Sequence, residues 1–117
     1  PVTDTGANST LLDPEEGLRL AAGKADLAAD MLSMLLASLE ADREAIRAAR
    51  DADDRNGLIE QVHRLNGASR YCGVPQLRAA CQRSETLLKQ ENPQAQQALD
   101  ELDGAISRLA AQAKLSV

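Results

Sequence analysis

The feature that most constrains this chain is the spacing of its apolar residues, which recur every three or four positions along four long segments. On an α-helix this spacing places the apolar side chains on one face, where neighbouring helices can bury them. Strands are disfavoured, because the chain holds 21 Ala and 18 Leu residues but only seven Val and Ile residues together. The pattern predicts an all-α domain.

Local signals at the segment ends place one short helix before four long ones. Asp13 is a candidate N-cap, Pro14 suits the first position of a helix, and Gly23 ends the short helix after about Ala22. The long helices are expected from Lys24 to about Arg50, from near Asp53 to Gly73, from Pro75 to Asn92, and over a final segment that carries Leu99 to Ala113. We expect Gly73 to adopt the left-handed conformation that is common at helix C-termini.

The connections between the long segments are only a few residues long, which favours antiparallel neighbours. We therefore expect an antiparallel up-and-down four-helix bundle with a short additional N-terminal helix packed over one end. This bundle takes in residues 13–117, whereas residues 1–12 are interpreted as a mobile leader or linker because they show no apolar period. Leu27, Met31 and Met34 are expected on the core side of their helix.

Charge and composition argue against several classes of partner. The net charge of −5 repels phosphate backbones and anionic lipids, and Tyr71 is the sole aromatic residue, so nucleic acid and carbohydrate are poor candidates. No apolar run in the helical part approaches the roughly 20 residues that span a bilayer, and no membrane contact by this fragment is expected. Cys72 and Cys81 are expected as small buried residues in a reducing cytosol, not as metal ligands.

The one histidine of the chain, His63, is the candidate reactive group. At about 100° per residue, its side chain points roughly 140° away from the centre of the apolar stripe of its segment, so it faces water. Asn66, Gly67 and Arg70 follow within two turns on the same face, and Ile59 precedes it by one turn. Ile59 either contributes to a docking surface on this face or packs against the short first helix.

Gly67 is an unusual choice in an exposed helix, where glycine costs about 1 kcal/mol relative to alanine. The missing side chain leaves room for a second protein to reach His63. A neutral imidazole can attack an acyl phosphate directly, so this face could accept a phosphoryl group. The alternative is that His63 is incidental and that the chain is a structural or oligomerisation module, or a non-catalytic adaptor that binds a receiver.

The run from His63 to Gly73, His-Arg-Leu-Asn-Gly-Ala-Ser-Arg-Tyr-Cys-Gly, resembles the signature of histidine-containing phosphotransfer (HPt) domains. In that signature His-x-Leu-Lys-Gly is followed by two small residues and by a further Gly ten positions after the His. Leu77, Cys81 and Glu85 stand where the family tends to place Leu, a small residue or Cys, and an acid or amide. The resemblance covers about residues 14–114 and is nearest to the C-terminal HPt domain of hybrid sensor kinases of the GacS/BarA type.

The resemblance implies a phosphorelay intermediate that takes a phosphoryl group from a receiver-domain aspartate and passes it to the receiver domain of a response regulator. By position in the motif, His63 would be the phosphoacceptor, through Nε2. Glu85 would accept a hydrogen bond from Nδ1 and so orient the imidazole. Gly67 would be the gap that admits the partner.

The expected partner-binding residues surround His63 on its face of the helix, and they are Ile59, Arg64, Asn66, Gly67 and Arg70. One of them departs from the family pattern, since Asn66 occupies the position that the family usually gives to Lys. Arg64 or Arg70 is therefore a candidate for the positive charge beside the phosphoryl group.

The resemblance also implies where the rest of the chemistry lies. The expected partners are the receiver domain of the same hybrid kinase and the receiver domain of a response regulator, with Mg²⁺ held by the receiver and no cofactor in this chain. Nothing in the sequence resembles an ATP-binding kinase core. We expect a monomer as an isolated domain, located in the cytoplasm at the end of a membrane-bound sensor kinase.

Overall fold

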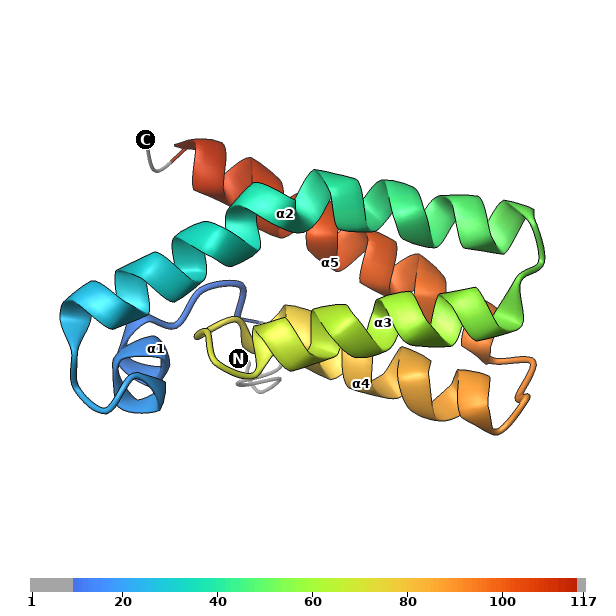
Figure 1. The fold of residues 1–117 in the computed structure, drawn as a ribbon, viewed down its shortest axis with the longest axis horizontal. Helices are drawn as coiled ribbons and strands as arrows, with labels where there is room; N and C mark the ends of the chain where they lie inside the picture. Colours follow the sequence, from blue (N-terminus) through green and yellow to red (C-terminus); the bar gives the residue numbers. More distant parts are fainter. Residues whose placement is uncertain (1–9, 116–117) are drawn as a thin grey trace, which may run out of the picture.

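The computed structural model describes residues 10–115, which form five α-helices and no strand (Figure 1). The helices are α1 (Pro14–Leu20), α2 (Ala25–Asp51), α3 (Arg55–Ser69), α4 (Pro75–Lys89) and α5 (Ala95–Leu115). Each bound lies within a few residues of the predicted one. The all-α prediction and the order of one short helix followed by four long ones are confirmed.

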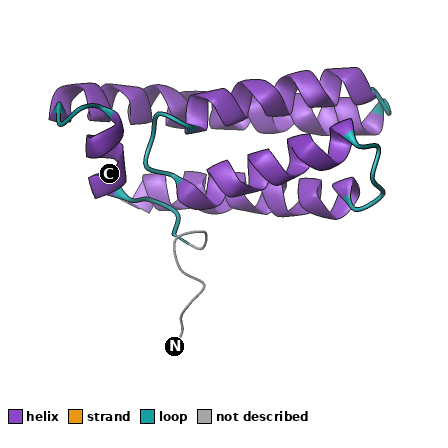
Figure 2. Ribbon diagram, turned by 90° about the horizontal axis from the view of Figure 1, so that it is seen from below, coloured by secondary structure: helices purple, strands orange, loops and turns teal. Residues whose placement is uncertain are grey.

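The four long helices pack as an antiparallel ring, in which each helix contacts the next and α5 returns to α2 (Figures 1 and 2). Short connections place successive helices side by side in opposite directions, as the sequence predicted. α1 contacts α2 and lies beneath its N-terminal end, beyond the end of α3 (Figure 1). The bundle with a short helix over one end is thus the observed architecture.

The interior of the bundle is built from aliphatic side chains of all four long helices, without an aromatic residue. The buried residues follow the predicted stripes. They are Leu35, Leu39, Ile46, Leu58, Val62, Leu65, Leu77, Cys81, Leu88, Leu99, Leu102, Ile106 and Leu109. Cys72 and Cys81 are both buried free thiols, in agreement with the sequence interpretation.

Two aspartates begin helices by accepting backbone hydrogen bonds. The Asp13 carboxylate accepts from the Glu16 amide at 3.1 Å, and the Asp54 carboxylate accepts from the Gly57 amide at 3.0 Å. Each bond satisfies an amide that has no partner inside its own helix, which stabilises the first turn. The Asp13 cap was predicted, and the cap at Asp54 lies one residue after Asp53, near which the sequence predicted the start of this helix.

The prediction for Gly73 is wrong, since its backbone is not left-handed. Instead the N-terminal segment crosses it closely, and the Asp13 amide donates to the Gly73 carbonyl at 2.7 Å. A Cβ at position 73 would overlap the Asp13 carbonyl oxygen and would lie 2.8 Å from the Gly17 nitrogen. Glycine is needed here because of close backbone contact between the start of α1 and the turn before α4.

The fold also begins earlier than residue 13. The Thr10 carbonyl accepts from the Gln76 amide at 3.0 Å, and Leu11 and Leu12 pack against the core. The proposed leader is therefore wrong at residues 10–12, because two apolar side chains there find buried partners. Its remaining part, residues 1–9, lies outside the described residues.

The N-terminal half of α2 departs from the predicted burial. Met34 is 72% exposed and Leu27 is 44% exposed, whereas Met31 packs against the core as expected. α2 has 27 residues and α3 only 15, so the first turns of α2 extend past the neighbouring helix. Periodicity identifies the face of a helix, but the length of its neighbour decides how much of that face is covered.

Candidate functional site

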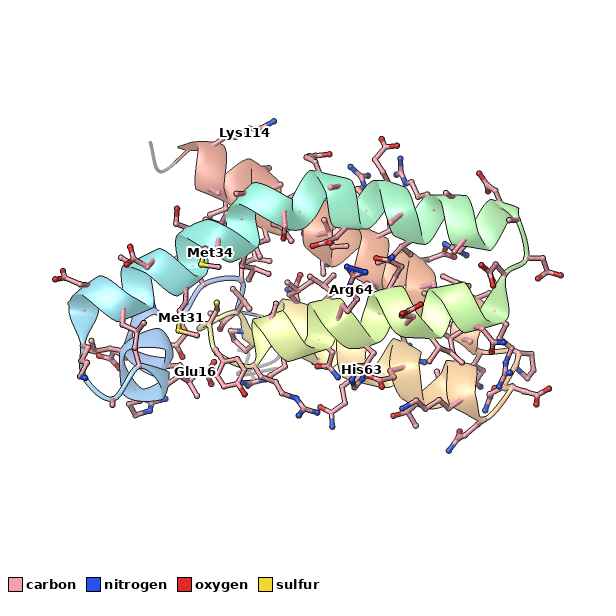
Figure 3. All side chains as sticks on the ribbon, viewed as in Figure 1. Glu16, Met31, Met34, His63, Arg64 and Lys114 are labelled. Carbon is pink, nitrogen blue, oxygen red and sulfur yellow. The ribbon has the colours of Figure 1, made fainter. Side chains whose placement is uncertain are left out.

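His63 lies on α3 at the edge that faces α4, with a side chain that is 68% exposed (Figure 3). Its Nδ1 atom is 2.7 Å from Oε2 of Glu85, which projects from α4. Nε2 has no hydrogen-bond partner among residues 10–115. One ring nitrogen is therefore held by the protein, and the other is free to meet a partner.

The Glu85 carboxylate is buried and gathers three donors. Oε2 accepts hydrogen bonds from Nδ1 of His63 and, at 2.8 Å, from Nζ of Lys89. Oε1 accepts a hydrogen bond from Nδ2 of Asn66 at 3.0 Å. Burial of this carboxyl opposes its ionisation, but the donors outweigh burial and lower the pKa of Glu85 to about 2. The group is a carboxylate at neutral pH.

An ionised carboxylate can only accept hydrogen bonds, so Nδ1 of His63 must carry the proton in this contact. In a neutral imidazole the lone pair then resides on Nε2, the nitrogen that is directed away from Glu85. In this tautomer Nε2 can act as a nucleophile without rotation of the ring.

The register of two antiparallel helices brings these groups together. His63 and Asn66 are one turn apart on α3, and Glu85 and Lys89 are one turn apart on α4. The end of α4 is fastened to the start of α3 by Arg55, whose guanidinium donates to the Leu88 carbonyl at 2.9 Å and 3.1 Å. These bonds join the last turn of α4 to the first turn of α3 and so help to fix the register at the site.

Gly67 leaves an open space one turn beyond His63. A Cβ built on Gly67 would find no atom of the chain within 4 Å, apart from its own helix backbone and chain neighbours. No close helix crossing in this structure requires the glycine, so its cost in an exposed helix is not offset within the chain. The opening beside the ring is a feature of the free surface.

The remaining predicted site residues divide between the surface and the interior. Arg64 and Arg70 are exposed, and neither guanidinium forms an ion pair in the part of the chain that the structure describes. In Figure 3, Arg64 leaves α3 at the edge that faces α2, opposite His63. Ile59 is partly buried and packs against the core, and its predicted alternative, packing on the short first helix, is wrong because α1 packs on α2 and not on α3.

The expectation that Asn66 is a surface residue of the interface is wrong. Only 4% of the residue is exposed, and its amide is engaged with Glu85. A polar side chain on this edge of α3 is buried by the neighbouring helix because it can donate to a buried carboxylate there. Asn66 therefore holds the Glu85 carboxylate from the interior and does not line the surface.

Sequence reasoning missed two parts of the site. Lys89 was not singled out, although its position four residues after Glu85 places both on one helix face. The second part is an apolar groove of about 350 Å³ between α2 and the end of α3, which includes the exposed Met34 and Tyr71 and also Ala68, next to Gly67. The exposed methionine could not be foreseen from a pattern that assigned it to the core.

No group of three or more His, Cys, Asp or Glu side chains within residues 10–115 is arranged to hold a metal ion. In the same range, none of the helices combines the length and the apolar character that a bilayer crossing requires.

Comparison with known proteins gives consistent matches. A sequence model of the family described as "Hpt domain" matches residues 30–112. The chain is 75% identical over 111 residues to the sensor histidine kinase GacS of Pseudomonas protegens, covering 95% of this chain and 12% of that protein. It is 39% identical over 102 residues to the signal transduction histidine-protein kinase BarA of Escherichia coli, covering 82% of this chain and 11% of that protein.

The fold has a close counterpart among solved structures. The crystal structure of the HPT domain from an Hpt sensor hybrid histidine kinase of Shewanella superposes with a TM-score of 0.83 at 33% sequence identity. The match covers 90% of this chain and 92% of that chain. The curated relatives are much longer, and this chain spans about 12% of their length.

Proposed function

This chain belongs to the Hpt domain family, a family of phosphotransfer modules, and we propose that it serves as the phosphorelay intermediate of a hybrid sensor kinase with His63 as its phosphoacceptor. The single observation that carries the assignment to His63 is the 2.7 Å contact between its Nδ1 atom and the ionised Glu85 carboxylate. In the neutral ring that contact keeps the proton on Nδ1, so the lone pair for attack on phosphorus lies on Nε2 of an exposed side chain.

In the proposed step, the Nε2 lone pair forms a bond to the phosphorus of a receiver aspartyl phosphate. The bond between that phosphorus and the aspartyl oxygen breaks, and the receiver carboxylate leaves with the electron pair. The ring gains positive charge while the proton stays on Nδ1, where the Glu85 carboxylate offsets it. Transfer to a second receiver is the same step in reverse.

The proposed partners are two receiver domains, one in the same hybrid kinase and one in a response regulator. The relatives are sensor kinases in which a domain of this kind forms about 12% of the chain, which supports a place beside other signalling domains. Mg²⁺ would be held by the receiver, where it stabilises the charge of the transferring group. As part of a membrane-bound sensor kinase, the domain would lie in the cytoplasm, and we propose that by itself it is a monomer.

We assign the docking surface to the exposed face that runs from His63 over Gly67 to the apolar groove at Met34 and Tyr71. Met34 is 72% exposed and Tyr71 is 56% exposed, and large exposed apolar groups of this kind are typical of interaction surfaces. Arg64 and Arg70 are exposed near this face and would interact with acidic groups of a receiver.

The proposal is tested by incubating the chain with a radiolabelled, phosphorylated receiver domain of a GacS-type kinase in the presence of Mg²⁺. Label should move to the wild-type chain and should be stable in alkali and labile in acid, as expected for phosphohistidine. The His63→Gln variant should receive none, while circular dichroism shows that it is folded. Label on the variant would reject His63 as the acceptor.

The same assay separates the relay from a structural or oligomerisation module. A structural module would take no label even in the wild-type form, whereas a receiver-binding adaptor would bind the receiver without taking label. The exposed, oriented imidazole favours the relay, since neither alternative requires a free Nε2.

A further inference from the structure

A phosphoryl group on His63 would bring two negative charges next to the Glu85 carboxylate, and a nearby cation is needed to offset them. The position three residues after His63 cannot supply one, because Asn66 is neutral, buried and already bonded to Glu85. Charged residues close to His63 in the sequence of α3 are Glu60 and Arg64, and on α4 the group around it contains Glu85 and Lys89.

Lys89 is the cation that the structure ties to the reactive ring. Its Nζ atom is 2.8 Å from Oε2 of Glu85, the same oxygen that is 2.7 Å from Nδ1 of His63. The ammonium group and the imidazole are therefore neighbours across a single oxygen atom. The Lys89 side chain is 57% exposed, so it has freedom to turn from the carboxylate toward a group on the ring.

The backbone at Lys89 is fixed relative to α3. Lys89 is the last residue of α4, and its carbonyl accepts from Nη2 of Arg55 at 3.3 Å, next to the two bonds that Arg55 makes to the Leu88 carbonyl. The side chain thus starts from a defined point on the His63 side of the bundle. The two arginines considered from the sequence are placed less well. Arg64 points toward α2 (Figure 3), and Arg70 follows the last residue of α3.

We propose that Lys89 binds the phosphoryl oxygens on Nε2 of His63 and so supplies from α4 the positive charge that Asn66 cannot supply from α3. This inference rests on the proposed function of His63. In the unphosphorylated chain Lys89 helps to hold Glu85, and on phosphorylation its ammonium group is shared between the carboxylate and the phosphoryl oxygens. No proton or electron changes place in this contact.

The test uses phosphoramidate, a small phosphoryl donor that needs no receiver, and follows the pKa of the phosphoryl group by ³¹P NMR between about pH 5.5 and 8.5. A cation in contact favours the dianion and lowers that pKa. In the Lys89→Met variant the phosphoryl pKa should rise by about half a unit or more, and the difference should shrink in high salt. Lys89→Arg should restore the wild-type value, which a purely structural role for Lys89 would not require.

Lys114→Met is the matched control, since Lys114 is exposed on α5 at the opposite edge of the molecule from His63 (Figure 3). It should leave the phosphoryl pKa unchanged. Equal values in the wild type and in Lys89→Met would overturn the inference, as would a shift produced by Arg64→Met or Arg70→Met instead. Lys89→Gln provides a second neutral variant should Lys89→Met fail to fold.

The two proposals fail in different ways. If phosphoramidate labels His63→Gln, or leaves the wild-type chain without an acid-labile phosphoryl group, the assignment of His63 falls and the role of Lys89 falls with it. If His63 is labelled in every lysine variant with the same phosphoryl pKa, only the role of Lys89 is rejected.

Discussion

At the level of single residues, the Glu85 carboxylate joins His63, Asn66 and Lys89 through both of its oxygens. Because an ionised carboxylate only accepts hydrogen bonds, this contact selects the neutral tautomer of His63 that carries its proton on Nδ1. In the proposed relay, the choice of Nε2 as the reactive nitrogen therefore depends on a residue of the neighbouring helix.

Replacing Glu85 should slow phosphoryl transfer without unfolding the bundle. Glu85→Ala frees the ring to rotate and to change tautomer, and we expect the rate to fall about 10- to 100-fold, by analogy with the loss of an orienting partner from a metal-bound imidazole. Stability should fall by about 1 to 3 kcal/mol, because the buried Asn66 amide loses its acceptor. Transfer assays and urea unfolding measure the two effects, and an unchanged rate would remove the orienting role.

Gly67 allows stability and function to be separated at one position. Since a Cβ meets nothing there, Gly67→Ala should raise the free energy of unfolding by about 1 kcal/mol. The same methyl group should slow transfer from a receiver, which must approach closely, and should leave labelling by phosphoramidate unchanged.

Gly104→Ala is the matched control for this variant, because a Cβ there would meet only the flexible end of Arg108, at 3.0 Å. It should leave both transfer reactions unchanged. Wild-type rates from a receiver in Gly67→Ala would show that the opening beside His63 plays no part in docking.

Prediction from sequence succeeded for residues whose role depends on one helix alone. The exposure of His63 follows from its angle to the apolar stripe of α3, and the N-cap role of Asp13 follows from the proline after it. Lys89 and the buried Asn66 were beyond such reasoning, since both depend on the register between α3 and α4. Glu85 was identified only through the family resemblance.

At the level of elements, the docking of α1 depends on backbone contact at Gly73. The Asp13 amide bonds the Gly73 carbonyl, and Arg78 of α4 lies 3.3 Å from the Glu16 carboxylate of α1. The sequence indicated a helix end at Gly73 because glycine is common there. A close approach between two distant backbone segments also requires glycine, and it cannot be recognised from the local sequence.

Gly73→Ala should destabilise the fold, because its Cβ would lie 2.8 Å from the Gly17 nitrogen and would also meet the Asp13 carbonyl. We expect a loss of about 1 to 3 kcal/mol in urea unfolding, the usual cost of forcing an extra carbon into a packed site. In Gly17→Ala the new Cβ makes an ordinary 3.4 Å contact with the Gly73 nitrogen, so this variant should be nearly neutral by comparison. Equal stability of the two variants would contradict the close-contact explanation.

At the level of the whole molecule, ion pairs join α2 to α5 on the side of the bundle away from the reactive edge. Oδ1 of Asp103 on α5 accepts hydrogen bonds from Nε of Arg43 at 3.1 Å and from Nε of Arg47 at 3.0 Å. These hydrogen bonds lower the pKa of Asp103 from 3.8 to about 2. The folded chain therefore holds two carboxylates, Asp103 and Glu85, whose pKa values are lowered.

The bundle should therefore lose stability in acid. A carboxylate with a pKa lower in the folded than in the unfolded chain stabilises the fold above its unfolded value and loses that effect as pH falls. For Asp103 and Glu85 the window runs from ordinary values of 3.8 and 4.5 down to about 2. Urea unfolding at a series of pH values should show the free energy of unfolding falling across this range.

Asp103→Asn isolates one of the two contributions. At pH 7 it should cost about 1 kcal/mol, since the arginines remain partly solvated. Its loss of stability between pH 4 and pH 2 should be smaller than that of the wild type. A pH dependence parallel to that of the wild type would show that Asp103 does not contribute to acid sensitivity.

The central claim is that Nε2 of His63 takes the phosphoryl group, while Nδ1 keeps its proton and donates it in a hydrogen bond to Glu85. The most direct measurement is ¹⁵N NMR of the labelled imidazole before and after transfer from a phosphorylated receiver. We predict a bond from phosphorus to Nε2, with the proton still on Nδ1. A bond from phosphorus to Nδ1, or a phosphorylated chain with an unchanged His63 ring spectrum, would contradict the account.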